Sequence, residues 1–363
     1  MKVLILGGRF SNAGGTERVG SMLANALSEA GYEIILASLL YSEKPFFPIN
    51  EDIKVISLFD SPGRTSIRTP SIIYKTRRLL KKEKADAVIV VESMAVLYTL
   101  PATAGLPVIH ICWEHFNFKN DLGIKGRSIA RQLAAKYCDS VVTLTERDKE
   151  YWLKGTKHKS QITAIANPCP FSVQSYTQPV NSKLVIAVGR LSYQKGFDLL
   201  LDSWIEVNKI KPDWKLKIIG EGEDRYKLTK FIQLNNLTDS VELVGNTDNI
   251  SQYYEQAEIF CMSSRFEGFP MVLLETLAFG VPVVSFDCET GPAEILKDTG
   301  SILVEQNDTK QLADSLIELM NDEQRRKDIC LKSKNKAKIY QLENIINQWI
   351  ELLENLKAIK GLS

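Results

Sequence analysis

The chain has no long uninterrupted hydrophobic run, although 44% of its 363 residues are hydrophobic. No apolar stretch reaches the roughly 18 residues that a membrane-spanning helix requires. The first apolar stretch, residues 3–6, runs directly into Gly7-Gly8 and is too short for a signal peptide. These absences predict a globular, cytoplasmic protein that begins with a buried strand.

Histidine is rare and cysteine is scattered. The three His predict no metal cluster, and the six Cys form no Cys-x-x-Cys pair. Isolated cysteines of this kind are typical of buried thiols in a reducing compartment rather than of disulfides or a zinc site. The Gly-x-Gly-x-x-Gly fingerprint is also missing after the first strand of either half, which argues against an NAD-dependent dehydrogenase.

The net charge of +1 hides an asymmetry. Residues 1–170 carry 23 Lys and Arg against 16 Asp and Glu, a net of +7, and the remainder carries 22 against 28, a net of −6. Residues 64–84 concentrate the excess, with Arg64, Arg68, Lys75, Arg77, Arg78, Lys81, Lys82 and Lys84 against Glu83 alone. This basic amphipathic pattern predicts a helix that either lies on an anionic bilayer surface or packs on its own sheet with a solvated basic side. No nucleic-acid partner is predicted.

Short apolar runs alternate with longer amphipathic ones, which is the pattern of parallel α/β sheets. The expected strands are 3–6, 34–39, 55–58, 87–91, 108–112 and 141–145 in the first half, and 184–188, 216–219, 241–244, 259–262, 283–286 and 302–304 in the second. Helical patterns fall between them, for example in residues 17–30 and 128–137, and residues 309–359 are expected to be helical only.

This order predicts an α/β fold with two doubly wound, Rossmann-like domains. The polar, turn-rich residues 171–183 are the expected linker between an N-terminal domain, 1–170, and a C-terminal domain, 184–340. The last segment, 341–363, is expected to form a helix that either returns to the first domain or packs on the second. Ligands bind at the carboxyl ends of such strands, so the active site is expected in a cleft that the two domains face.

The most informative segment is 264–275, Ser-Arg-Phe-Glu-Gly-Phe-Pro-Met-Val-Leu-Leu-Glu. Pro270 suits the first position of a helix, so Glu267 would precede that helix and Glu275 would lie about two turns inside it. The unpaired N–H groups of a helix start attract anions. Carboxylates can bind the hydroxyls of a nucleotide sugar, and main-chain amides can bind its phosphates, so this mixture suits such a ligand. The same spacing also fits a helix cap followed by a solvated Glu.

The segment resembles the E-x7-E signature of retaining glycosyltransferases of family 4. Gly280 and Pro282 follow it where the family has a helix stop and the next strand. The resemblance covers nearly the whole chain, is closest to the type that builds bacterial surface polysaccharides, and implies the GT-B fold of two Rossmann-like domains facing a cleft.

Two further elements carry the resemblance. Arg190 and Lys195 follow a predicted strand, where a diphosphate would need cations, and their Gly-Arg-Leu-x-x-x-Lys-Gly context resembles the family's diphosphate-binding element. Gly14 and Gly15 lie in a Gly-Gly-x-Glu-Arg element, whose backbone in the family faces donor phosphate or acceptor.

The resemblance implies individual roles. Glu267 would contact hydroxyls of the donor sugar, Glu275 the ribose, and His115, just past the strand 108–112, the donor sugar. Arg190 and Lys195 would stabilise charge on the leaving diphosphate. The predicted catalytic residues are therefore Glu267, His115, Arg190 and Lys195, and the predicted donor-binding residues are Gly14, Gly15, Arg190, Lys195, Gly268, Phe269, Met271 and Glu275.

Two neighbouring features receive structural predictions. Gly291-Pro292-Ala293-Glu294-Ile295 resembles an element frequent in bacterial polysaccharide transferases and is expected to shape the donor pocket. His110, inside a predicted strand, is expected in the core.

The resemblance implies no cofactor and no metal, with the nucleotide diphosphate sugar as co-substrate. The chain has no Asp-x-Asp triplet, which argues against the metal-dependent GT-A type. Glu267 and Glu275 would both lie on the donor side instead of flanking the anomeric carbon as in retaining glycosidases. The resemblance therefore favours a same-face reaction in which the leaving phosphate oxygen takes the acceptor proton.

The resulting functional prediction is transfer of a hexose or N-acetylhexosamine, preferably from a UDP-sugar and next from guanosine-linked mannose. The acceptor would be a glycan or a polyprenyl-diphosphate-linked glycan in surface polysaccharide biosynthesis, at the inner face of the plasma membrane. Two alternatives stay open: a nucleotide-sugar 2-epimerase of the same fold, and a non-enzymatic nucleotide-sugar-binding partner at the membrane.

Overall fold

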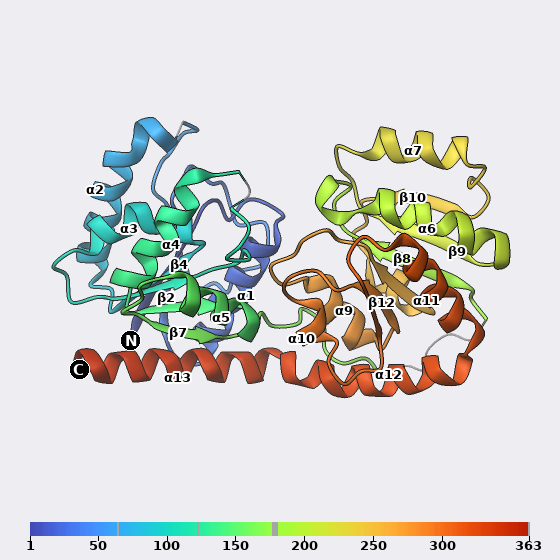
Figure 1. The fold of residues 1–363 in the computed structure, drawn as a ribbon. Helices are drawn as coiled ribbons and strands as arrows, with labels where there is room; N and C mark the ends of the chain where they lie inside the picture. Colours follow the sequence, from blue (N-terminus) through green and yellow to red (C-terminus); the bar gives the residue numbers. More distant parts are fainter. Residues whose placement is uncertain (64, 122, 176–180, 362–363) are drawn as a thin grey trace. The chain divides into compact units, whose positions relative to one another are not determined.

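The chain divides into two compact units in the computed structural model, which describes residues 1–63, 65–121, 123–175 and 181–361 (Figure 1). The first unit comprises Met1–Pro168 together with Leu342–Ser363, and the second comprises Cys169–Gln341. Each unit contains one parallel sheet with helices on its faces, so the predicted α/β class with two doubly wound domains is confirmed.

The sheet of the first unit has seven strands in the order β3-β2-β1-β4-β5-β6-β7. Its strands are β1 Lys2–Gly7, β2 Glu33–Ser38, β3 Lys54–Ser57, β4 Ala87–Val91, β5 Ile109–Trp113, β6 Ser140–Thr143 and β7 Gln161–Ala164. Its helices are α1 Gly15–Glu29, α2 Thr65–Glu83, α3 Val96–Thr103, α4 Lys125–Tyr137, α5 Glu146–Gly155 and α13 Leu342–Lys360, with a short 3₁₀ turn η1 at Ser93–Ala95. The central strands are apolar because both faces of the sheet are covered; all five residues of β4 are buried.

The helix α13 returns to the first unit from the far end of the sequence, which decides between the two packings that the sequence left open (Figure 1). Trp349 is fully buried, and its ring lies 5.0 Å from that of Trp113 at the end of β5. The Tyr32 hydroxyl donates to Glu354 at 2.7 Å, and the ammonium of Lys360 lies 2.8 Å from the Asp139 carboxylate. The first unit is therefore built from two segments of chain that are distant in sequence.

The sheet of the second unit has six strands in the order β10-β9-β8-β11-β12-β13. Its strands are β8 Leu184–Val188, β9 Lys215–Ile219, β10 Val241–Gly245, β11 Ile259–Met262, β12 Val283–Phe286 and β13 Ile302–Val304. Its helices are α6 Phe197–Ile210, α7 Arg225–Leu234, α8 Ser251–Gln256, α9 Met271–Phe279, α10 Pro292–Ile295, α11 Thr309–Asn321 and α12 Glu323–Ala337, with 3₁₀ turns η2 at Tyr193–Lys195 and η3 at Lys338–Tyr340. β8 and β11 are neighbours, so the loops that follow them leave the same edge of the sheet side by side.

The boundary between the units lies at Pro168, ahead of the stretch 171–183 in which the sequence placed the linker. Residues 176–180 of that stretch lie outside the described residues. The residues before them pack on the second unit: the ring of Phe171 lies 5.2 Å from that of Phe279, and the Gln174 amide donates to the Ala278 carbonyl at 2.9 Å. The first residues of the predicted linker therefore belong to the second unit.

The helix α9 of the signature segment begins one residue later than the sequence suggested. Pro270 is its N-cap, in an extended conformation with ψ 98°, and Met271 is the first helical residue. Gly280 adopts the left-handed conformation at φ 69° and ends the helix, as predicted.

Two predictions from absences can be compared with the structure. Cys112, Cys138, Cys169, Cys261, Cys288 and Cys330 are all buried free thiols, as expected. Within the described ranges, no helix is both long enough and apolar enough to cross a bilayer.

Candidate active site

Lys195 and Glu267 form a close ion pair in the second unit, with Nζ and Oε1 2.7 Å apart. Lys195 lies in the loop after β8, and Glu267 lies in the loop after the neighbouring strand β11. Both side chains are largely withdrawn from solvent, with 18% and 7% of their surfaces exposed. The structure thus brings together two predicted catalytic residues that are 72 positions apart in sequence.

The Glu267 carboxylate is held from several sides. The Ser264 hydroxyl donates to Oε1 at 2.7 Å, and the Gln194 amide nitrogen lies 3.5 Å from Oε2. The Thr290 hydroxyl donates to the main-chain carbonyl of Glu267 at 2.7 Å. A carboxylate fixed by this many contacts is preorganised to receive a ligand. Gln194 and Thr290 received no role from the sequence, although both lie directly beside recognised elements.

Gly196 permits the close approach of the two loops. It has φ 63°, and a Cβ atom built on it would lie 2.1 Å from the main-chain oxygen of Ser263. The Ser263 hydroxyl donates to the Lys195 carbonyl at 3.0 Å in the same place. A glycine is therefore required at this position for both conformation and space.

Arg190 is the exposed cation of the site. Its Nε lies 3.1 Å from Glu223 Oε2, and 73% of its side-chain surface is accessible. An exposed pair of this kind contributes little to stability, so an anionic ligand can replace Glu223 at little cost. The structure does not bring Arg190 into the Lys195–Glu267 contact.

Glu275 lies inside α9 and is buried, with one carboxylate oxygen accepting a hydrogen bond from the Tyr254 hydroxyl at 2.8 Å. Burial and the adjacent carboxylate raise the pKa of Tyr254 well above its usual range, so the phenol stays a donor. Tyr254, at the end of α8, stacks on Phe279 with ring centroids 5.1 Å apart. Tyr254 had no motif to reveal it, because it acts from a short helix whose position depends on the tertiary fold.

The start of α9 is tightly backed by the loop before α10. Gly291 has φ 104°, and a Cβ atom there would lie 2.4 Å from Cδ of Pro270. Phe269 is buried and Gly268 is half-buried beside it. The first N–H groups of a helix lack intrahelical partners, so Met271 presents a donor at this end of α9. The element around Gly291 thereby supports the helix start, and its expected part in the donor pocket stays a prediction.

His115 follows β5 in the first unit and is buried, with its ring 4.5 Å from that of Trp113. Burial lowers the pKa of His115 to about 3, so the imidazole is neutral near pH 7. Its Nε2 has no hydrogen-bond partner among the described residues. The buried Glu114 carboxylate accepts from the main-chain amides of His115 and Phe116, both at 3.1 Å, and so fixes the turn that carries the imidazole.

Glu92, which the sequence did not single out, follows β4 and has φ 79°, a strained conformation for a residue other than glycine. Its carboxylate pairs with the buried Arg127 at 2.8 Å. It also lines a cavity of about 70 Å³ beside the turn that follows β1. The position of Glu92 directly after a buried strand could have identified it from the sequence, because ligands bind at the carboxyl ends of such strands.

Gly14 and Gly15 lie at the start of α1, and they differ in the space that a Cβ atom would find. A Cβ atom on Gly14 would lie 2.2 Å from the Glu17 carboxylate, whereas nothing lies within 4 Å of one on Gly15. The Glu17 carboxylate ends a flexible side chain and can move aside, so neither glycine is required by space alone. Across the described ranges, no three His, Cys, Asp or Glu side chains gather in a way that would hold a metal ion.

Comparison with known proteins covers nearly the whole chain. Residues 13–171 match the family model described as Glycosyltransferase Family 4, and residues 170–336 match Glycosyl transferases group 1. An uncharacterized glycosyltransferase of Haemophilus influenzae is 35% identical over 344 residues, which are 94% of this chain and 97% of that protein. The amylovoran biosynthesis glycosyltransferase AmsD of Erwinia amylovora is 33% identical, covering 97% and 99%. An α-1,4-N-acetyl-D-galactosaminyltransferase of Campylobacter jejuni, whose name specifies an undecaprenyl-diphosphate-linked acceptor, is 28% identical, covering 95% and 96%.

Solved structures show the same fold. The sucrose-phosphate synthase of Thermosynechococcus elongatus has a TM-score of 0.85 at 16% identity, covering 99% of this chain and 100% of that one. Anabaena HepE, in complex with UDP and glucose, has a TM-score of 0.79 at 17% identity, covering 98% and 99%.

Proposed function

This chain is a member of glycosyltransferase family 4 with the GT-B fold, and we propose that it transfers a hexose or N-acetylhexosamine from a UDP-sugar with retention of configuration. The observation that carries the proposal is the Lys195–Glu267 pair, 2.7 Å apart at the carboxyl ends of adjacent strands. The acceptor in this proposal is a glycan or a polyprenyl-diphosphate-linked glycan of a bacterial surface polysaccharide, as the names of two relatives suggest.

The donor diphosphate is proposed to lie against Lys195 and Arg190. Lys195 is already desolvated, so its charge acts on a developing diphosphate anion through a medium that screens it less than water does. Arg190 exchanges its exposed contact with Glu223 for the phosphate and can bind it with two parallel hydrogen bonds. The amides of Gly268, Phe269 and Met271 would add donors at the helix start.

Glu267 is proposed to bind hydroxyls of the donor sugar, and Glu275 those of the ribose. The Ser264 hydroxyl donates to the Glu267 carboxylate, and the Tyr254 hydroxyl donates to the Glu275 carboxylate. These contacts orient the carboxylates rigidly, so hydroxyl binding requires little side-chain ordering.

The reaction is proposed to proceed on one face of the sugar, without a metal ion. The leaving phosphate oxygen takes the proton of the acceptor hydroxyl as the new bond forms and the old one breaks. His115, with Gly14 and Gly15, completes the proposed set from the first unit. A neutral imidazole fits a hydrogen-bonding role toward the sugar better than a charged one.

Contact with an anionic membrane is proposed for the outer side of α2. Arg68, Lys75 and Arg77 each donate to a main-chain carbonyl of their own unit, which draws these three side chains toward the protein. An outer strip remains, formed by the exposed residues Ile67, Tyr74, Arg78, Lys81 and Lys82. Two apolar side chains beside three cations suit an anionic bilayer surface. Arg64 lies outside the described residues.

The test is thermal stabilisation of the protein by a panel of nucleotide sugars without added metal. A ligand at 100 times its dissociation constant raises the free energy of unfolding by about 2.7 kcal/mol. We expect one UDP-sugar to shift the melting temperature and Arg190→Ala to lose that shift.

Product analysis by NMR then reports the anomeric configuration. An epimerised nucleotide sugar formed without acceptor would favour an epimerase, and stabilisation without any turnover would favour a non-enzymatic binding role.

A further inference from the structure

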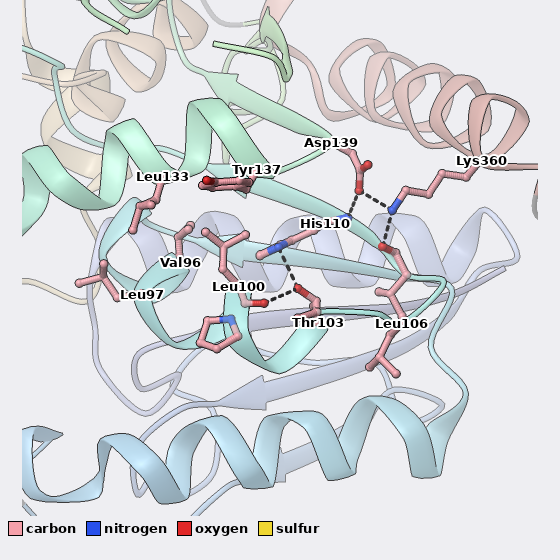
Figure 2. A pocket seen from close by; sticks show the side chains of 13 residues that line it. Val96, Leu97, Leu100, Thr103, Leu106, His110, Leu133, Tyr137, Asp139 and Lys360 are labelled. Atoms are coloured by element: carbon pink, nitrogen blue, oxygen red, sulfur yellow. Dashed lines mark hydrogen bonds and ion pairs between the residues drawn. The ribbon is translucent and has the colours of Figure 1, made fainter. Parts of the chain in front are cut away.

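A second cavity, of about 420 Å³, opens in the first unit between α3 and α4 (Figure 2). It lies at the amino ends of its strands, because Val108 precedes β5 and Asp139 precedes β6. Glu92 and His115, in contrast, follow the carboxyl ends of β4 and β5. The cavity therefore belongs to the opposite edge of the sheet, and the proposed transfer reaction does not use it.

Apolar side chains form most of its walls, and Figure 2 shows Leu106 nearer the Lys360 end and many of the others at the opposite end. Val96, Leu97 and Leu100 of α3 face Leu133 and Tyr137 of α4 there. The volume falls within the range of about 300–1,000 Å³ that is typical of small-molecule sites. A small apolar group fits this end of the cavity.

The polar end of the cavity carries one positive and one negative side chain, so its net charge is zero. The Lys360 ammonium pairs with the Asp139 carboxylate at 2.8 Å and donates to the Val108 carbonyl at 2.6 Å. The same carboxylate accepts from the His110 main-chain amide at 2.7 Å. An ammonium has three N–H donors, so the third N–H of Lys360 is available to a ligand. A charged ligand would have to compete with the internal ion pair, whereas an uncharged hydroxyl would not.

His110 lies between the two ends, and its imidazole has spare acceptor capacity. Its Nε2 lies 3.0 Å from the Thr99 hydroxyl and its Nδ1 lies 3.4 Å from the Thr103 hydroxyl. Both hydroxyls already donate to main-chain carbonyls, of Ala95 and Thr99, and can only accept from the ring. Burial keeps the ring neutral, with a pKa of about 4, so it carries a single proton. One ring nitrogen is thus left as an acceptor without a donor from these threonines.

We propose that this cavity binds the aliphatic chain of an uncharged amphiphile, with a hydroxylated head at the Lys360–Asp139 end. The chain lies between α3 and α4, and the head accepts from Lys360 and donates toward His110. Such a chain comes either from a neutral membrane lipid, with linear methylenes, or from a free polyprenol, with branched isoprene units. Binding goes beyond the proposed transferase activity and does not depend on it.

The experiment is calorimetric titration of the full chain with three ten-carbon probes below their solubility limits: 1-decanol, decanoate and decylamine. We expect saturable binding of decanol and at least tenfold weaker binding of both charged probes. Geraniol, an isoprenoid alcohol of equal carbon number, separates the two sources. Tighter decanol binding indicates a membrane lipid chain, and tighter geraniol binding indicates an isoprenoid chain. Preference for decanoate or decylamine, or no saturable binding of either alcohol, overturns the proposal.

Two variants place the site. Leu100→Trp and Leu133→Trp fill the cavity from opposite walls and should each weaken alcohol binding at least tenfold. Leu234→Trp, on the exposed surface of α7 in the second unit, is the matched control and should bind as the unchanged protein does. Circular dichroism checks folding. As a measurement that needs no variant, hydrogen exchange of α3 and α4 amides should slow when decanol binds. Unchanged exchange together with unchanged affinity in both variants would refute the location.

Discussion

The Lys195 ammonium and the Glu267 carboxylate, 2.7 Å apart, satisfy each other at the edge of the second sheet. Removing one partner leaves the other charged group with little water to solvate it. Because a buried charge without a partner is costly, the pair behaves as a unit in both stability and function.

Lys195→Met should therefore reduce both turnover and stability. We expect kcat to fall about 10²–10³-fold, as when one electrostatic donor is removed from an active site. Adding Glu267→Gln removes the orphaned charge, so the double variant should recover melting temperature while staying inactive. Lys209→Ala, which removes an exposed ion pair on α6, is the control and should change neither. Full activity in Lys195→Met would contradict the site assignment.

Gly196→Ala should destabilise the second unit by more than backbone strain alone. A left-handed alanine costs roughly 1–2 kcal/mol, and here its Cβ would also meet a main-chain oxygen at 2.1 Å. Gly105→Ala provides the strain-only comparison, since its φ is 69° and nothing lies within 4 Å of the added carbon. Urea denaturation of both variants measures the difference. Equal losses would show that the loop shifts freely.

The stability of the first unit should fall in mild acid because of His110. Its pKa is about 4 in the fold against an ordinary value of 6.5, so the unfolded chain takes up the proton first. The stabilisation is fully present above pH 6.5 and is lost as the pH falls toward 4. Between these two pH values the free energy of unfolding falls by about 1.4 kcal/mol per pH unit, because unfolding takes up one proton.

His110→Gln should remove that part of the pH dependence, even if the variant is less stable at neutral pH. Urea midpoints between pH 7 and 4 give the slope. His158→Gln, at an exposed position, is the matched control and should leave the slope unchanged. An unchanged slope in His110→Gln would mean that the ring is already protonated in the folded protein.

Trp349→Ala should cost about 3–5 kcal/mol, because the ring is fully buried against Trp113. Ile359→Ala, ten positions further along α13 and 76% exposed, should cost less than 0.5 kcal/mol. Thermal unfolding distinguishes them. Similar small effects would indicate that α13 contributes little to the first unit.

Much of the fold followed from local patterns. Every strand expected from an apolar run is present within one or two residues, because parallel strands buried on both faces need continuous Val, Ile and Leu. The stop of α9 at Gly280 followed from the requirement for a left-handed residue. The destination of α13 did not follow, since its apolar stripe fits either unit equally well.

The site was predictable only in part. The motifs named Lys195 and Glu267, and the loops of adjacent strands bring them together. Tyr254, which donates to the Glu275 carboxylate, and Thr290, which donates to the main-chain carbonyl of Glu267, were not predictable because they come from other elements and carry no spacing signal. The burial of the His115 ring depends on Trp113 and on the turn fixed by Glu114, neither of which has a sequence signature. The roles assigned to these residues stay predictions until the variants are measured.

The return of α13 to the first unit has a consequence for synthesis on the ribosome. Trp113 emerges 236 residues before Trp349, so the whole second unit is translated while the first still lacks its last helix. At about 5–20 residues per second this interval lasts roughly 10–50 seconds. During that time the apolar surface beneath α13 is uncovered, which makes the nascent first unit a candidate client of chaperones. The first unit can therefore complete its fold only after the second unit has been synthesised.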